Sequence, residues 1–300
     1  MNRGTIAAFS TYLSWGLLPI FWKWLQDVPA LETLAHRMVW SFFLLVIVLS
    51  VRRKWEWLRP ALRQPKLALT FLISGLLLGA NWIVYIWSVN TDHVVDASLG
   101  YFINPLANVL LGVIFLKETL RRNQGIAVGI AAIGVVYLAL SFGVTLWISL
   151  TLAFTFAIYG LLHKQGSLPG FEGLTLEMGL FLLPALGLLL YFGGQGTGSF
   201  GQTGLTTSLL LAATGIVTVI PLVLFDYGAK RVRLITLGIL QYVAPSLQFL
   251  LGVLVYGEAF TTARVIGFSI ICAALALYTY DAIRVARRRP RLASAPVAAD

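Results

Sequence analysis

The sequence consists largely of apolar stretches of about 20 residues, separated by short polar segments. A helix rises 1.5 Å per residue, so ~30 Å of bilayer hydrocarbon is crossed by roughly 20 apolar residues. Charged residues make up only 11% of the chain, against about 25% in a typical soluble domain. The sequence therefore predicts an all-α polytopic membrane protein. Its ten predicted transmembrane helices are residues 4–23, 32–51, 67–88, 95–116, 123–141, 145–163, 173–192, 206–226, 234–256 and 263–281.

Basic residues are concentrated in alternate loops. With the N-terminus placed in the cytoplasm, the cytoplasmic segments include residues 52–66, 117–122 and 230–233, whereas the opposite side holds only Lys23 and Arg264. Cytoplasmic loops of membrane proteins carry such an excess of Lys and Arg. We therefore expect both termini in the cytoplasm. This distribution accounts for the net charge of +10, so we expect no nucleic-acid partner.

The first half of the chain recurs in the second half at an offset of 140 residues. The recurrence is carried by three pairs of identical residues, Pro105 and Pro245, Gly112 and Gly252, and Glu118 and Glu258. Each half holds five predicted helices, so the second copy enters the membrane from the opposite side. We expect two five-helix inverted repeats, residues 1–142 and 143–283, and a disordered basic cytoplasmic tail at 284–300. Inverted repeats are typical of secondary transporters.

Two predicted helices that correspond through this repeat carry polar faces. Residues spaced by four, three and four positions share one face of a helix. The faces comprise Tyr101, Pro105, Asn108 and Gly112 in the first half and Gln241, Pro245, Gln248 and Gly252 in the second. Proline leaves the carbonyl four residues earlier without its donor, which is costly in lipid. We predict that the tyrosine and amide residues bind solute and that the prolines and glycines allow bending. The alternative is a pair of kinked helices whose glycines permit close packing.

Aromatic and polar side chains on other predicted helices complete the candidate solute pathway. These are Trp15, Asn81, Tyr85, Ser88, Tyr159 and His163. Such a lining suits an amphipathic organic solute, whereas a bare ion requires rings of carbonyl or charged groups. His163 is the group here whose charge changes most readily near neutral pH, although a lone histidine next to a lysine more often marks a membrane interface.

Ionisable residues inside predicted helices are candidate functional groups, because charge in hydrocarbon is costly. His36 and Arg37 lie about one turn inside the second predicted helix, and Glu32 precedes His36 by four residues. Either Glu32 neutralises one of them, or Arg37 holds a solute carboxylate, and His36 or Arg37 is a coupling group. Glu177 is expected at a membrane interface. Glu258 is expected beside the helix that follows it, where the helix dipole favours a carboxylate.

Known catalytic motifs are absent from the sequence. It contains no phosphate-binding Gly-Lys loop, no paired Asp cluster, no His-Glu-x-x-His and no Gly-x-Ser-x-Gly. We therefore expect no enzyme activity, no cofactor and no bound metal.

Three segments carry a resemblance to a known family. They are Glu-Thr-Leu-Ala-His-Arg-Met-Val-Trp-Ser (32–41), Asn-Trp-Ile-Val-Tyr-Ile-Trp-Ser-Val-Asn (81–90) and Leu-Gly-Tyr-Phe-Ile-Asn-Pro-Leu (99–106). They resemble the RarD-like branch of the drug/metabolite transporter superfamily, in proteins with two EamA domains. The resemblance covers nearly the whole chain. It implies an exporter of the bacterial inner membrane, with a central cavity lined by the first, third, fourth, sixth, eighth and ninth helices. Relatives in this superfamily export amino acids, including aromatic ones, and other small metabolites.

The residues and the resemblance together predict a secondary exporter of small amphipathic metabolites, above all amino acids, that works by alternating access. Its partners are expected to be the solute and the lipid bilayer, with a monomer sufficient for transport. A drug exporter is the nearest alternative. From other classes, the alternatives are an integral membrane enzyme acting on lipid and a channel or sensor.

Overall fold

The structure is a computed structural model that describes residues 3–117, 119–142, 146–165, 168, 170–229, 231–232 and 240–293. All regular secondary structure in these ranges is helical. The elements are α1 (Arg3–Lys23), α2 (Ala30–Arg52), α3 (Leu58–Leu62), α4 (Pro65–Asn90), α5 (Val94–Leu116), α6 (Arg122–Phe142), α7 (Leu146–Gln165), α8 (Gly170–Gly194), α9 (Leu205–Ala229), α11 (Val243–Leu250), the π-helix η1 (Leu251–Val255) and α12 (Thr262–Ala293).

Most of these helices have the length and composition of membrane spans. Within the described residues, eight are long and apolar enough to cross a bilayer, and two shorter apolar helices cover Arg122–Leu138 and Val243–Val255. Large apolar side chains such as Leu140 and Leu183 are 85% and 78% exposed, which suits lipid and would be costly in water. The structure thus confirms an all-helical polytopic membrane protein.

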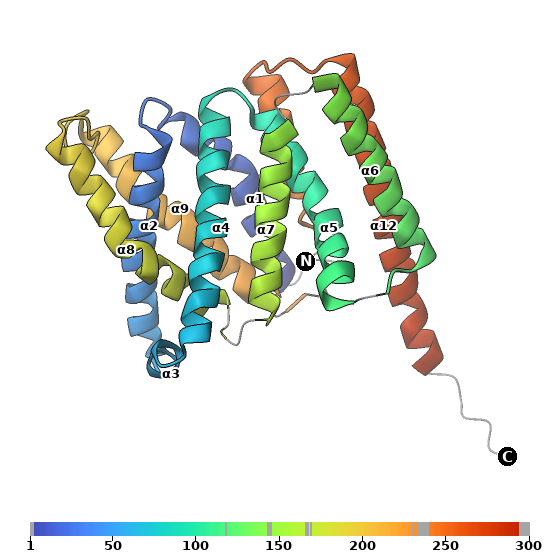
Figure 1. Ribbon diagram of the computed structural model, residues 1–300, viewed down its shortest axis with the longest axis horizontal. Helices are drawn as coiled ribbons and strands as arrows, with labels where there is room; N and C mark the ends of the chain where they lie inside the picture. The colour runs from blue at the N-terminus through green and yellow to red at the C-terminus, as the bar shows by residue number, and fades with distance from the viewer. Residues whose placement is uncertain are drawn as a thin grey trace.

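Helices from the two halves of the chain interleave instead of forming two separate bundles (Figure 1). α2 packs against α8 and α9, α7 packs against α4 and α5, and α1 packs against α9 and α11. α6 and α12 pack against each other at the right edge of Figure 1. We call the end that carries segments 24–29, 91–93, 195–204 and 256–261 the upper end, and the end that carries α3 and segment 117–121 the lower end.

The two prolines that correspond through the sequence repeat lie in different backbone settings. Pro105 is buried in the middle of α5. Pro245 is the third residue of α11, because Gln241 and Tyr242 form a turn directly before that helix. One helix over 234–256 with Pro245 as an internal bending point was expected, whereas the proline lies in the first turn of α11. Proline is well tolerated there, because an N–H in the first turn has no intrahelical acceptor. Residues 234–239 of the same predicted span lie outside the described part of the chain.

The two glycines of the repeat also differ in their surroundings. A Cβ on Gly252 in η1 would lie 2.7 Å from Val95 Cγ2, so η1 contacts the first turn of α5 closely. Gly112 lies near the end of α5, where its carbonyl accepts a hydrogen bond from the Lys117 N–H. Glu118, the partner of Glu258 in the repeat, lies outside the described residues.

The last helix extends beyond the predicted end of the last span. α12 continues past the predicted end of the last span at residue 281 and ends at Ala293. The disorder expected from residue 284 onward stays a prediction. Alanine and arginine have high helix propensity, and they dominate this stretch, which extends below the helix bundle in Figure 1. Residues 294–300 lie outside the described part.

Close packing between α2 and α9 makes Gly215 a sensitive position. A Cβ there would lie 2.6 Å from the Trp40 carbonyl carbon, which cannot move without α2. We expect Gly215→Ala to cost about 1–3 kcal/mol through overpacking and to lower the thermal unfolding midpoint in detergent by at least ~3 °C. Gly187→Ala in α8, with no atom within 4 Å of the added Cβ, is the matched control. An equal unfolding midpoint for both variants would show that the close approach of Gly215 to Trp40 does not restrict the residue at position 215.

Candidate functional site

Arg37 is the central residue of the candidate site. It lies seven residues after Ala30, the first residue of α2, and only 5% of its surface is exposed. Its Nε donates a hydrogen bond to Thr218 Oγ1 on α9 at 2.9 Å. Its guanidinium carbon lies 3.7 Å from the ring centroid of Trp82 on α4 and 5.1 Å from that of Trp22 on α1. Cation–π contacts hold a guanidinium in an apolar setting, so the charge is fixed between four helices.

The Arg37 guanidinium pairs with no carboxylate among the described residues. Its Nη1 is buried and has no hydrogen-bond acceptor in this part of the chain. Glu32, the neutralising partner considered from the sequence, accepts hydrogen bonds from the Ser199 N–H at 2.6 Å and the Ser199 hydroxyl at 3.0 Å instead. A buried charge left without a partner costs several kcal/mol. In a membrane protein, such a group is a functional candidate by default.

His36 makes contacts that are separate from those of Arg37. Its Nδ1 accepts a hydrogen bond from Trp40 Nε1 at 3.3 Å, and its ring stacks on Phe200 with centroids 5.0 Å apart. Its Nε2 lies 3.9 Å from Glu32 Oε1. The two neighbouring residues therefore face different surroundings, and His36 packs against segment 195–204.

Two tyrosines and an asparagine from α4 and α5 lie close to the Arg37 charge. The rings of Tyr85 and Tyr101 are 5.6 Å apart, edge to face, and both tyrosines interact electrostatically with Arg37. The Tyr101 hydroxyl donates to Asn81 Oδ1 at 3.3 Å. Asn81 Nδ2 in turn donates to the Leu152 carbonyl at 3.0 Å. This chain of bonds fixes the Tyr101 ring near the guanidinium.

Gln248 on α11 approaches the same place from the second half of the chain. Its Nε2 donates to the Trp15 carbonyl at 3.1 Å. Its side chain faces Tyr85, yet neither Gln248 Oε1 nor the Tyr85 hydroxyl has a partner at hydrogen-bond distance in the described part of the chain. Trp15 itself packs in an aromatic cluster with Tyr12 and Phe225. Gln248 Oε1 and the Tyr85 hydroxyl thus face each other beside the Arg37 guanidinium.

We call this constellation the Arg37 site. It consists of Trp22, Arg37, Asn81, Trp82, Tyr85, Tyr101, Thr218 and Gln248, which come from α1, α2, α4, α5, α9 and α11. A guanidinium binds planar carboxylates through two parallel hydrogen bonds. Tryptophan and tyrosine rings offer apolar surface beside it. The arrangement can therefore hold a small molecule that carries both a carboxylate and an apolar part.

Three further residues predicted to bind solute lie outside the Arg37 site. Ser88 is buried, and its hydroxyl donates within α4 to the Tyr85 carbonyl at 2.9 Å. Asn108 is exposed, and its Nδ2 donates to Asn104 Oδ1 at 3.0 Å. Gln241 is half-buried in the turn before α11. The periodicity of a helix shows which residues share a face, but the depth of each residue depends on neighbouring helices.

Tyr159 and His163 belong to a second buried group, which we call the Glu177 cluster. His163 Nε2 lies 2.7 Å from Glu177 Oε1 and 3.1 Å from Ser74 Oγ. The Ser74 hydroxyl also donates to Glu177, and the Tyr159 hydroxyl lies 3.5 Å from Glu177 Oε2. Glu177 is 0% exposed, so protein encloses its carboxylate, while its expected depth at a membrane interface stays a prediction. Ser74 on α4 and Tyr159 and His163 on α7 enclose the carboxylate of α8.

Sequence reasoning did not assign Glu177, Trp22, Trp82 or Thr218 to a site. One signal was present for Glu177, which lies 140 positions after Arg37, the offset that also relates Pro105 to Pro245. Trp22, Trp82 and Thr218 have no comparable signal in the sequence. Their contacts with Arg37 depend on how α1, α4 and α9 pack against α2.

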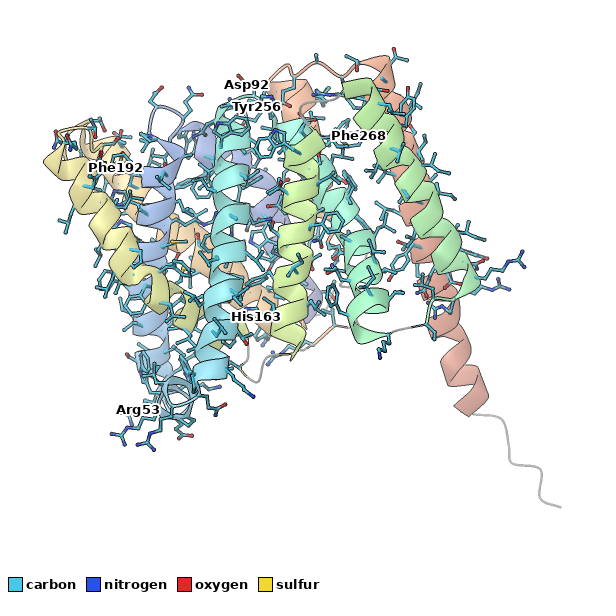
Figure 2. All side chains as sticks on the ribbon, in the orientation of Figure 1. Arg53, Asp92, His163, Phe192, Tyr256 and Phe268 are labelled. Atoms are coloured by element: carbon cyan, nitrogen blue, oxygen red, sulfur yellow. The ribbon has the colours of Figure 1, made fainter. Side chains whose placement is uncertain are left out.

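Glu258 joins the two halves of the chain at the upper end, two residues after Tyr256, which is labelled in Figure 2. Its carboxylate accepts hydrogen bonds from the backbone N–H groups of Val94 at 2.6 Å and Val95 at 2.8 Å. These belong to the first turn of α5, so Glu258 caps α5. The sequence instead predicts a position beside the helix that follows it, α12, and that prediction is wrong. Burial raises the pKa of Glu258 above its ordinary value, and the two backbone hydrogen bonds oppose that shift.

Ion pairs also connect segments of the chain at both ends of the molecule. At the upper end, Lys23 Nζ lies 2.5 Å from Asp92 Oδ1, with Asp92 labelled in Figure 2. At the lower end, Arg121 Nε lies 2.8 Å from Asp281 Oδ2, which connects the start of α6 to α12. Each pair joins segments that are distant in the sequence.

Comparisons with known proteins agree with this architecture. Residues 2–140 match the EamA-like transporter family. The chain is 51% identical over 296 residues to Protein RarD of Streptomyces exfoliatus, a match that covers 98% of this chain and 94% of the relative. It is 44% identical over 293 residues to an uncharacterized transporter of Vibrio cholerae, covering 97% of each. A solved crystal structure superposes with a TM-score of 0.59 over 92% of this chain and 97% of the other at 20% identity, which is a likeness of fold.

The family predicted from the three sequence segments is thereby confirmed. The matching family and the Vibrio cholerae relative are named as transporters, so the chain is a membrane transporter and not a lipid-modifying enzyme. A relative that is 51% identical over nearly the full length fixes the branch as well as the family. The chain belongs to the EamA family of the drug/metabolite transporter superfamily and is a homologue of RarD.

Proposed function

We propose that this chain is a secondary exporter of the bacterial inner membrane that carries small amphipathic carboxylates, above all amino acids, including aromatic ones. The observation that carries the proposal is the buried Arg37 guanidinium, which has a free Nη1 and two tryptophan rings against it. In this proposal the solute carboxylate binds Arg37 and its apolar part lies against the aromatic rings. The solute then supplies the counter-ion that the described residues do not.

Helix packing supports the arrangement as ten spans in two inverted repeats. The repeat relates α1 to α7, α2 to α8, α4 to α9, α5 to α11 with η1, and α6 to α12. Packing contacts recur under this relation: α1 packs on α9 as α7 packs on α4, and α1 packs on α11 as α7 packs on α5. Such symmetry allows inward-open and outward-open states to exchange around one site, which is the basis of alternating access.

The distribution of charge supports an orientation with both termini in the cytoplasm. The basic loop 52–66, with Arg53 labelled at its start in Figure 2, lies at the lower end. Cytoplasmic loops carry such an excess of Lys and Arg. The lower end is then cytoplasmic, and Glu258 closes the external end. A monomer contains the complete Arg37 site, so we propose that a monomer suffices for transport.

Counterflow in proteoliposomes tests the solute class. Vesicles preloaded with unlabelled L-phenylalanine are diluted into labelled L-phenylalanine, and competitors are added outside. We expect saturable counterflow that L-leucine inhibits, while L-phenylalaninamide and phenethylamine, which lack the carboxylate, inhibit at least ~10-fold more weakly, because loss of a charge-assisted hydrogen bond costs about 1.5–3 kcal/mol. Absence of saturable amino-acid flux, or equal inhibition by the two carboxylate-free analogues, would reject the proposal. Strong inhibition by neutral drugs alone would instead favour a drug exporter.

A further inference from the structure

The Glu177 cluster places a carboxylate and an imidazole side by side between helices of the bundle. The Glu177 side chain is 0% exposed and that of His163 is 14% exposed, and the two interacting atoms are 2.7 Å apart. The remaining polar contacts to the carboxylate come from the Ser74 and Tyr159 hydroxyl groups. His163 is labelled in the lower half of the molecule in Figure 2. A titratable pair is therefore buried within the bundle but reaches toward one end of it.

Few charged groups other than His163 face the cluster. Among the described side chains, the packed helices also carry Arg52 of α2, which lies over the Phe171 ring at 5.6 Å, the exposed Lys66 of α4, and the half-buried Glu172 of α8, and none of these is hydrogen-bonded to the cluster. Apolar rings complete the enclosure, with Phe71 against His163 at 5.3 Å. The side chains of Lys164 and Asp226 are outside the described part. His163 is thus the group in direct contact that can compensate the Glu177 charge.

The protonation of the pair decides its net charge. With one proton shared between Glu177 and His163 the pair is neutral overall, either as two neutral groups or as an ion pair. Loss of that proton leaves a carboxylate whose direct partners are neutral hydroxyl and imidazole groups. A lone anion in a low-dielectric interior is strongly disfavoured. Binding and release of one proton therefore changes the energy of packing α4, α7 and α8 around this point.

The position of the cluster relates it to the Arg37 site. Arg37 lies seven residues after the first residue of α2, and Glu177 lies seven residues after the first residue of α8. The sequence repeat makes these positions equivalent, yet they carry opposite charges. Their partners also correspond by helix, because Arg37 contacts α1 and α9 and Glu177 contacts α7 and α4. A motion that exchanges the roles of the two repeats therefore changes the surroundings of both groups together.

We propose that the His163–Glu177 pair is a proton-binding site that couples solute export to proton entry, an inference that rests on the proposed transport function. A proton taken up from the external side neutralises the pair and permits the return of the carrier. The proton is released to the cytoplasmic side when the inward-open state admits water to the cluster. The step moves one proton from water on one side to water on the other and involves no change in covalent structure.

Solute-linked proton movement in proteoliposomes tests this inference. Vesicles that contain pyranine report lumenal pH while labelled L-phenylalanine flux is followed in parallel. For the wild type we expect phenylalanine to drive a pH change that is abolished by a protonophore. For Glu177→Gln and for His163→Gln we expect the number of protons moved per phenylalanine to fall at least tenfold. Glu172→Gln, on the same helix but outside the cluster, is the matched control and should keep the wild-type ratio.

The possible results separate this inference from the proposed function. Phenylalanine counterflow without proton movement in the wild type overturns the coupling inference and leaves the transport function standing. Absence of counterflow in the wild type overturns both. An unchanged proton-to-phenylalanine ratio in either cluster variant overturns the assignment of the site. The ratio is measured only on protein that transports phenylalanine, so a folding defect in one variant leaves the other variant and the wild-type measurement as tests.

Discussion

Replacing Arg37 with glutamine is expected to reduce saturable phenylalanine counterflow at least ~30-fold. Glutamine keeps a similar length and can still donate hydrogen bonds, but it removes the positive charge and the planar fork that binds a carboxylate at two points. A loss of about 2 kcal/mol in solute binding corresponds to this factor. Arg37→Lys keeps the charge but lacks the planar fork, so its phenylalanine counterflow should lie between that of the wild type and that of Arg37→Gln.

The same substitution is expected to leave the protein as stable as the wild type or more stable. Arg37 is a buried cation without a carboxylate partner in the described structure, and removing an unpaired buried charge relieves its desolvation cost. The unfolding midpoint in detergent should therefore hold or rise while transport falls. Arg52→Gln, an exposed position on the same helix, serves as the control. A lower midpoint for Arg37→Gln, or wild-type transport by it, would count against a role in solute binding.

Replacing Glu258 with glutamine is expected to open the upper end of the molecule. The carboxylate accepts hydrogen bonds from two backbone N–H groups of α5, where the helix dipole adds to the attraction. A glutamine side chain offers only one oxygen acceptor, so its NH₂ group would face one of these donors. Charge-assisted hydrogen bonds contribute roughly 1.5–3 kcal/mol each. We expect the contact between segment 256–261 and α5 to weaken by about this amount.

Thiol labelling from the side of the upper end measures this opening. Cys272 is the only cysteine in the sequence and is exposed, so Cys272→Ser provides a background free of cysteine. Ala97→Cys in the first turn of α5, at a fully buried position, then reports access to the region that Glu258 covers. We expect Glu258→Gln to raise its labelling rate at least ~10-fold, and Glu56→Gln at an exposed lower-end position to leave it unchanged. Equal rates would mean that Glu258 does not hold this end closed.

The long helices could be predicted from the sequence because apolar length alone defines a membrane span. The predicted span 67–88 corresponds to α4 (Pro65–Asn90), and 206–226 corresponds to α9 (Leu205–Ala229). The turn at Gln241 and Tyr242 could not be predicted in the same way. Hydropathy stays high through that turn, and the break depends on how the backbone of the second half packs.

The candidate site was only partly accessible to sequence reasoning. Arg37 was identified because a charge inside an apolar run is rare. That Glu32 bonds to Ser199 and not to Arg37 could not be predicted, because Ser199 is distant in the sequence. Glu177 appeared interfacial because it lies close to the start of its helix. Its burial arises from α4 and α7, whose packing brings Ser74 and His163 against it.

The contact between Glu258 and α5 is expected to keep its strength when the salt concentration around the protein changes. Mobile ions screen charges in water within ~8 Å at physiological ionic strength, but they screen groups that exclude water much less. The Asp92 side chain, 67% exposed, pairs with Lys23 where added salt weakens the attraction. Glu258 is 9% exposed and bonds to backbone groups, so this contact at the upper end persists when the surroundings become saline.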